Sequence, residues 1–158
     1  MRRPALRVLD LAGGPAAMGH AHGTAYADEI RRYTDERVRL VGSGEWSGRP
    51  LDREGVLALA EACIPAHEAH SPVLHEEMCG MAEGAGITLA EAIVVGGFTD
   101  FVDTVRSHVA GSHPAAVVED DCTAFIVPDS RADGVGLYAQ TWDMHDSATE
   151  HVVLLRVR

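Results

Sequence analysis

The sequence has few aromatic residues and no lysine. Phe, Trp and Tyr make up 5% of the 158 residues, and the 13 basic residues are all arginine, a usage typical of a GC-rich bacterial genome. Acidic residues outnumber basic ones, so the formal net charge is −11 at pH 7. A nucleic-acid-binding protein needs a basic face, and this charge balance therefore argues against nucleic acid as a partner.

Long apolar runs are missing as well. No segment approaches the roughly 20 apolar residues of a membrane span. Arg7 and Asp10 interrupt the N-terminal apolar stretch before it reaches the length of a signal-peptide core. The three cysteines are widely spaced and fit a reducing compartment better than a disulfide framework. We therefore expect a soluble, cytoplasmic protein with no membrane partner, of a length that suits one domain.

Motifs for metals and nucleotides are also absent. The sequence contains neither Cys-x-x-Cys nor His-Glu-x-x-His, and its paired glycines do not form a G-x-G-x-x-G loop. The nine histidines leave two candidate clusters, His20 with His22 and His67 with His70. His75 follows a helix-breaking proline and is expected to lie apart from the second cluster. We expect no metal and no cofactor.

The order of patterns predicts an α+β fold, with helices first and a sheet afterwards. After a short strand at 6–13, helical periodicity recurs up to an acidic loop at 107–121. Beyond that loop the period changes, and apolar runs separated by turn residues predict an antiparallel meander with both faces covered. The predicted strands are 122–127, 135–142 and 151–158.

Local signals mark where several helices begin. Asp52 is a capping residue before the second long helix, and Ser71 followed by proline predicts the start of a third. Thr88 and Glu91 form a capping-box pattern that predicts a fourth. The last predicted strand runs to Arg158 without a closing element. We therefore expect the remaining C-terminal part of the same protein, or a complementary subunit, to complete the sheet.

Cys122 lies at the predicted start of a strand, directly after the acidic loop. If the Asp121–Cys122 bond is cut, Cys122 becomes N-terminal. Its own amine, with an unperturbed pKa of roughly 7.7–8.0, can then act as the base for its thiol. The same thiol can make the cut by attacking the carbonyl of Asp121. Without such chemistry Cys122 would be interpreted as a core thiol, as Cys63 and Cys79 are.

Four motifs carry a resemblance to a known family. "DDCTAF" followed by "AQTWDMH" resembles the penicillin acyltransferase family (acyl-coenzyme A:6-aminopenicillanic acid or isopenicillin N acyltransferase) and the related carcinine hydrolases. Upstream, "GGPAAMGHAHG" at 13–23 and "EEMCGMAEGAGITLAEAI" at 76–93 are similar to further motifs of that family. The similarity spans nearly the whole chain.

The resemblance implies a cysteine N-terminal nucleophile hydrolase, folded as an αββα sandwich and made as an inactive precursor. Cys122 would be the nucleophile, and Asp143 and Thr123 would orient the nucleophile or the substrate. The substrate would be a small-molecule linear amide or acyl thioester. The sequence does not determine whether the protein forms a homo-oligomer. Cleavage would leave 1–121 as a helical small subunit and 122–158 as the start of the nucleophile-bearing sheet.

Two features depart from the family pattern. The family usually has glycine before the cysteine, where this chain has Asp121. The oxyanion-hole asparagine is expected downstream of Arg158, and a missing donor costs about 10²–10³ in rate. The alternative is therefore a non-catalytic α+β scaffold or partner-binding domain derived from the same family.

Overall fold

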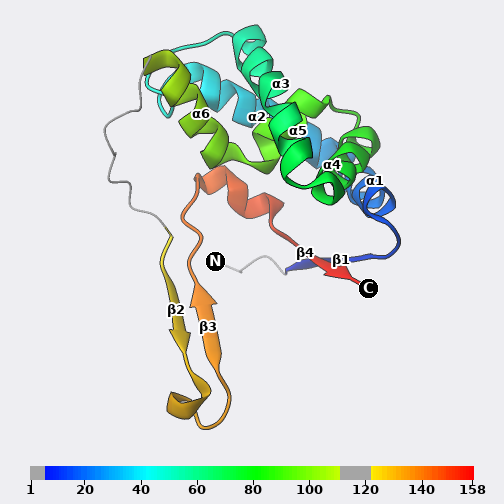
Figure 1. Cartoon of the computed structure of the whole chain (residues 1–158), viewed down its shortest axis with the longest axis vertical. Helices are drawn as coiled ribbons and strands as arrows, with labels where there is room; N and C mark the ends of the chain where they lie inside the picture. The colour runs from blue at the N-terminus through cyan, green and yellow to red at the C-terminus, as the bar shows by residue number, and fades with distance from the viewer. Residues whose placement is uncertain (1–5, 111–121) are drawn as a thin grey trace. The chain divides into compact units, whose positions relative to one another are not determined.

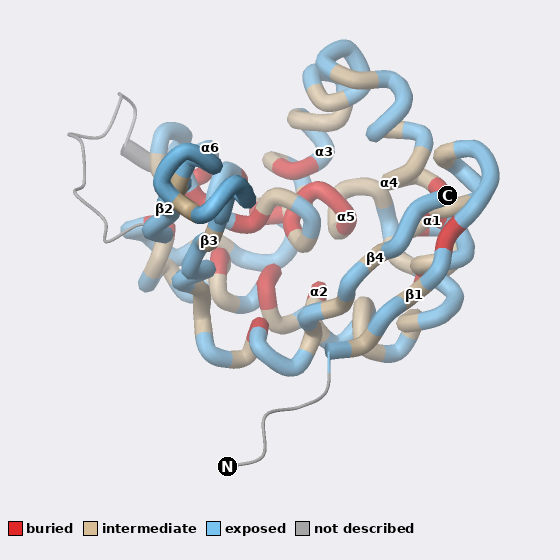
Figure 2. Tube along the Cα trace, turned by 90° about the horizontal axis from the view of Figure 1, so that it is seen from below, coloured by how far each residue is buried: buried red, intermediate tan, exposed pale blue. Residues whose placement is uncertain are grey.

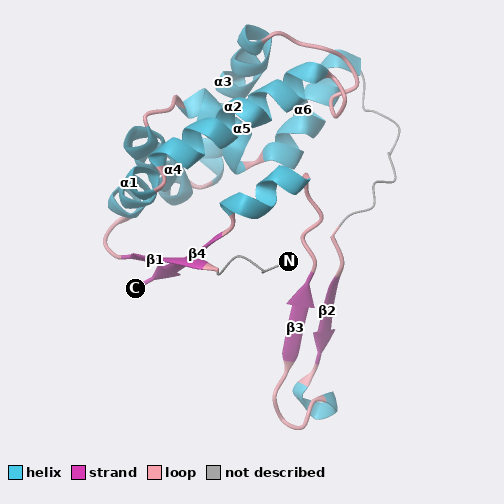
Figure 3. Cartoon of the chain, turned by 180° about the vertical axis from the view of Figure 1, so that it is seen from behind, coloured by secondary structure: helices cyan, strands magenta, loops and turns pink. Residues whose placement is uncertain are grey.

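The computed structural model describes residues 6–110 and 122–158 (Figure 1). The chain divides into two compact units, which are Met1–Pro114 with His151–Arg158 and Ala115–Glu150. Within the described residues, the first unit holds six α-helices and a parallel pair of strands, and the second holds a β-hairpin. Figure 3 distinguishes the helices from the strands by colour.

Helix starts in the first unit follow the predicted capping signals. The Asp52 side chain accepts a hydrogen bond of 2.8 Å from the backbone N–H of Gly55. Thr88 and Glu91 complete the predicted capping box, with the Glu91 N–H donating to Thr88 Oγ1 at 3.2 Å and the Thr88 N–H donating to Glu91 Oε2 at 2.9 Å. The helices are α1 (Pro15–Ala25), α2 (Ala27–Ser43), α3 (Arg53–His70), α4 (Pro72–Ala85), α5 (Leu89–Gly96) and α6 (Phe98–Ala110).

Helices α1 and α4 pack backbone to backbone through their glycines, and they lie side by side in Figure 1. A Cβ atom on Gly19 would lie 1.9 Å from the Glu77 carbonyl oxygen, and one on Gly23 would lie 2.2 Å from that of Met81. From the other side, a Cβ on Gly80 would lie 2.2 Å from the carbonyl oxygen of Ala16. The two upstream stretches that resemble the acyltransferase family therefore form one helix contact that requires glycine.

The core of the first unit gathers around α5. Figure 2 shows buried segments on α2, α3 and α5. The side chains of Val41, Val56, Val94 and Val105 have no exposed surface. In the described part of the chain, no single helix has both the length and the apolar composition to cross a membrane; α4 and α5 pass that test only together, across a bend of 110°.

Strand β1 (Arg7–Leu11) pairs in parallel with β4 (Val153–Val157). Arg156 donates two hydrogen bonds to the Asp10 carboxylate, at 2.6 and 2.7 Å, across this pair. The prediction that residues 151–158 form the third strand of an antiparallel meander is therefore wrong. An apolar run fits either partner equally well, so the sequence pattern could not show that this strand returns to the N-terminal one.

Strands β2 (Ala124–Val127) and β3 (Leu137–Gln140) form the second unit's antiparallel hairpin, as predicted. Ala124 pairs with Gln140. Phe125 and Ile126 are 56% and 76% exposed, so the expectation that both faces are covered is wrong for this hairpin. Two short 3₁₀ helices, Asp129–Arg131 and Asp146–His151, follow the two strands.

The predicted αββα sandwich and the predicted division into 1–121 and 122–158 concern the longer, cleaved protein. Both stay predictions.

Candidate active site

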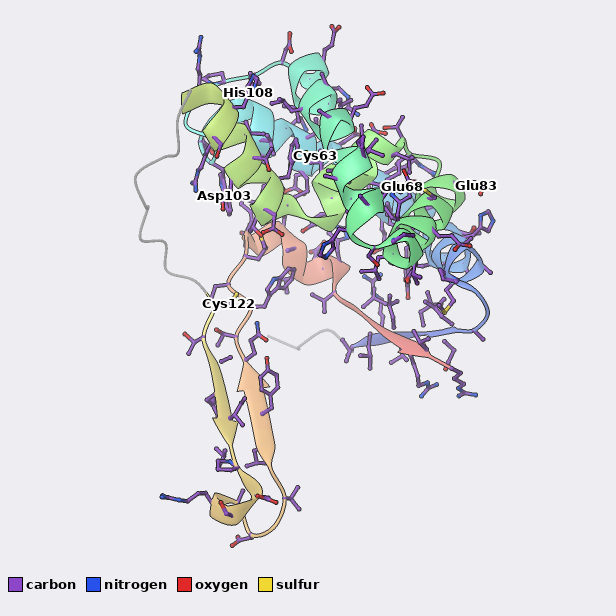
Figure 4. All side chains as sticks on the ribbon, in the orientation of Figure 1. Cys63, Glu68, Glu83, Asp103, His108 and Cys122 are labelled. Atoms are coloured by element: carbon purple, nitrogen blue, oxygen red, sulfur yellow. The ribbon has the colours of Figure 1, made fainter. Side chains whose placement is uncertain are left out.

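Cys122 lies at the open end of the β2–β3 hairpin. Its side chain is exposed, and Figure 4 labels it just before β2. The strand itself begins at Ala124, so Cys122 precedes the strand by two residues instead of opening it. The backbone N–H of Asp143 donates a hydrogen bond to the Cys122 sulfur at 3.1 Å. The predicted nucleophile and the predicted orienting residue are thus in contact.

Two threonines close the hairpin next to this contact. The register that pairs Ala124 with Gln140 sets Thr123 opposite Thr141. The Thr141 N–H donates to the Thr123 carbonyl at 2.8 Å, and the Thr123 N–H donates to the Thr141 hydroxyl oxygen at 2.9 Å. That hydroxyl in turn lies 3.3 Å from Asp143 Oδ2 and can donate to it. Main-chain and side-chain hydrogen bonds therefore link all four residues.

The thiolate is the nucleophilic form of cysteine. The Cys122 sulfur accepts a hydrogen bond of 3.1 Å. The donor is the main-chain N–H of Asp143, and the carboxylate of Asp143 is directed to Thr141. Asp143 thus contacts the sulfur through its backbone, a contact that the residue type alone does not predict.

The structure brings together three of the four predicted site residues. Cys122, Thr123 and Asp143 all lie at the hairpin end. Asp121, the fourth, lies outside the described residues. Thr141 is a further residue of this site, and the sequence alone did not predict it. The signal for it was its place two residues before Asp143 in the "QTWD" stretch, combined with a register that only the structure supplies.

The other two thiols have different surroundings. Cys63, on α3, donates a hydrogen bond to the Leu59 carbonyl at 3.3 Å. Burial, followed by the nearby charge of Glu68, raises the pKa of the Cys79 thiol and so disfavours its thiolate. Both are partly buried, which leaves Cys122 as the exposed cysteine among the described residues.

The histidines of the two candidate clusters lie on α1 and α3. His75 follows the break at Ser71 as expected, but the corner between α3 and α4 brings its ring to 5.7 Å from that of His67, centroid to centroid. Their Nδ1 atoms are buried without a hydrogen-bond partner. Within residues 6–110 and 122–158, no three His, Cys, Asp or Glu side chains gather around a common point as metal ligands would.

The first unit has its own cluster of titratable groups. The Glu29 carboxylate accepts two hydrogen bonds from Arg7, at 2.7 and 2.8 Å, and lies 3.6 Å from His151. The Arg7 hydrogen bond is the main reason that the pKa of Glu29 is lowered. His22 borders a cavity of about 670 Å³ among the helices, and burial lowers its pKa. The contacts of Glu29 join β1 and α2 to His151, two residues before β4 begins.

Comparison with known proteins finds a distant similarity to an acyltransferase. The chain is 23% identical over 145 residues to the 40 kDa form of acyl-coenzyme A:6-aminopenicillanic-acid-acyltransferase of Emericella nidulans. The match covers 92% of this chain and 36% of that protein, so the chain spans about a third of the relative's length. No protein-family model matches the chain. The similarity is distant.

Proposed function

We propose that the chain is the nucleophile-bearing N-terminal part of a self-cleaving cysteine amidohydrolase or acyltransferase. The observation that carries the proposal is the exposed Cys122 sulfur, held at 3.1 Å from the Asp143 N–H. The distant similarity to an acyltransferase covers this site and supports the same chemistry. Cys122 is the catalytic residue of the proposal, and Thr123 and Asp143 orient it.

Maturation proceeds by an acyl shift at the Asp121–Cys122 bond. The Cys122 sulfur attacks the Asp121 carbonyl, the C–N bond breaks, and the freed amine of Cys122 takes up the proton lost by the thiol. Water then hydrolyses the thioester, which releases a carboxylate on Asp121 and restores the thiol. The new amine serves as the base in later turnovers.

Turnover uses the same sulfur on a small substrate with a linear amide or an acyl thioester. The sulfur attacks the carbonyl, the amine or thiol leaves with a proton, and an acyl-enzyme forms on Cys122. Water resolves it in hydrolysis, and an amine resolves it in acyl transfer. The rest of an αββα sandwich, supplied by a C-terminal part or a complementary subunit, would provide the oxyanion donors.

Trapping the acyl-enzyme tests this function. The mature full-length protein is incubated with a short-chain acyl-coenzyme A and quenched in acid, and peptides are mapped by mass spectrometry. We expect the acyl group on the peptide that contains Cys122. Cys122→Ala should abolish both labelling and turnover, whereas Cys63→Ser, which changes a partly buried thiol, should retain both. Turnover by Cys122→Ala at the native rate would contradict the proposal.

A further inference from the structure

We propose that Thr141 is a positioning residue that holds the Asp143 N–H against the Cys122 sulfur; this inference rests on the proposed function. The Thr141 hydroxyl takes part in a ring that consists of three hydrogen bonds and the covalent segments between them. It accepts from the Thr123 N–H at 2.9 Å and lies 3.3 Å from Asp143 Oδ2. The ring closes through the Asp143 N–H, which donates to Cys122 at 3.1 Å.

The Thr141 hydroxyl has a single proton, which can be donated to only one of two nearby oxygen atoms. The Thr123 carbonyl lies 3.4 Å from Thr141 Oγ1 and already accepts the Thr141 N–H, whereas the Asp143 carboxylate lies nearer and carries charge. A charged acceptor makes the stronger hydrogen bond, so the proton is directed to Asp143. The oxygen's lone pairs then remain available to the Thr123 N–H. The Thr141 side chain thus binds both Thr123, before β2, and Asp143, after β3.

The consequence for the sulfur follows from the chain connectivity. Thr141 holds the carboxylate of Asp143, and the main-chain N–H of that same residue donates to the sulfur. On the other strand, Thr141 accepts a hydrogen bond from the N–H of Thr123, which directly follows Cys122. Without the hydroxyl, the ladder bond from the Thr141 N–H to the Thr123 carbonyl remains, but the Asp143 carboxylate and the Thr123 N–H both lose their hydrogen bond to Thr141. The donor at the sulfur then loses its fixed position.

Thiol alkylation tests this role independently of catalysis. The 158-residue chain is treated with iodoacetamide over a range of pH, and the modification of Cys122 is followed by peptide mass spectrometry. The readout is the rate at neutral pH divided by the rate on the alkaline plateau, where all the thiol is ionised. Loss of a thiolate-stabilising donor lowers this ratio, whereas a change of access alone alters both rates equally.

Thr141→Val keeps the branched shape and removes the hydroxyl. We expect the ratio to fall about three- to tenfold, the factor that corresponds to one hydrogen bond of ordinary net strength. Thr141→Ser keeps the hydroxyl and should restore most of the ratio. Thr149→Val, the same change at an exposed threonine of the same unit, should leave it unchanged.

An unchanged ratio in Thr141→Val would overturn the inference, as would a Thr141→Ser variant no better than Thr141→Val. The cleavage state of the longer protein separates this result from the proposed function. If the native protein is cleaved before Cys122 but Thr141→Val leaves the ratio unchanged, the positioning role fails and the function stands. If Thr141→Val lowers the ratio but the native protein is never cleaved, the positioning role stands and self-cleavage fails.

Discussion

The close contact between α1 and α4 predicts a large effect for a single methyl group. In Gly80→Ala, the new Cβ would lie 2.2 Å from the Ala16 carbonyl oxygen and 2.9 Å from the His20 nitrogen. Ordinary contact begins at 3.4 Å, so the oxygen distance is 1.2 Å too short. Both neighbours are main-chain atoms and cannot turn away, and the two helices must therefore separate.

The free-energy cost follows from two opposing terms. Overpacking of a well-packed contact costs about 1–3 kcal/mol, and a clash with main-chain atoms lies toward the upper end. Replacing a helical glycine by alanine returns about 0.5–1 kcal/mol. We therefore expect Gly80→Ala to lower the free energy of unfolding by about 2 kcal/mol.

Urea unfolding followed by far-UV circular dichroism measures this change. Gly96→Ala is the matched control, because a Cβ there meets no atom within 4 Å. The control should be neutral or slightly stabilising. A Gly80→Ala chain as stable as the native one would refute the helix packing described above.

Two further predictions concern the first unit. Thr88→Ala removes the capping box at the start of α5 and should lower the free energy of unfolding by about 1 kcal/mol, measured by the same urea titration; an unchanged midpoint would contradict the cap. Burial lowers the pKa of His22 in the folded protein, so the unfolded chain takes up a proton first as the pH falls through about 6.5. Stability contributed by neutral His22 is therefore present above that pH and lost below it. The melting temperature of His22→Gln should fall less steeply than the native one between neutral and acidic pH, and parallel curves would contradict this linkage.

Helix boundaries could be predicted where a local signal sets them. Asp52, Ser71 and Thr88 each bond to a backbone N–H within three residues, so the sequence contains everything that those contacts need. Strand pairing could not be predicted in the same way. The partner of Val153 is Arg7, almost the full chain length away, and a short apolar run carries no mark of its partner.

In the candidate site, too, the residues could be predicted from the sequence but their contacts could not. Cys122 and Asp143 could be identified from residue type and from the family resemblance. The atoms that meet could not be, because Asp143 approaches the sulfur through its backbone. Thr141 acquires its role from the hairpin register, which places its hydroxyl at the Thr123 N–H.

The proposed function depends on self-cleavage before Cys122. The most direct test is the intact mass of the longer native protein after expression and incubation, compared with that of Cys122→Ala. We expect two chains in the native sample, with the downstream one beginning at Cys122, and a single uncut chain in the variant. A native protein that remains uncut while turning over a linear amide, or a Cys122→Ala protein cut at the same bond, would contradict it.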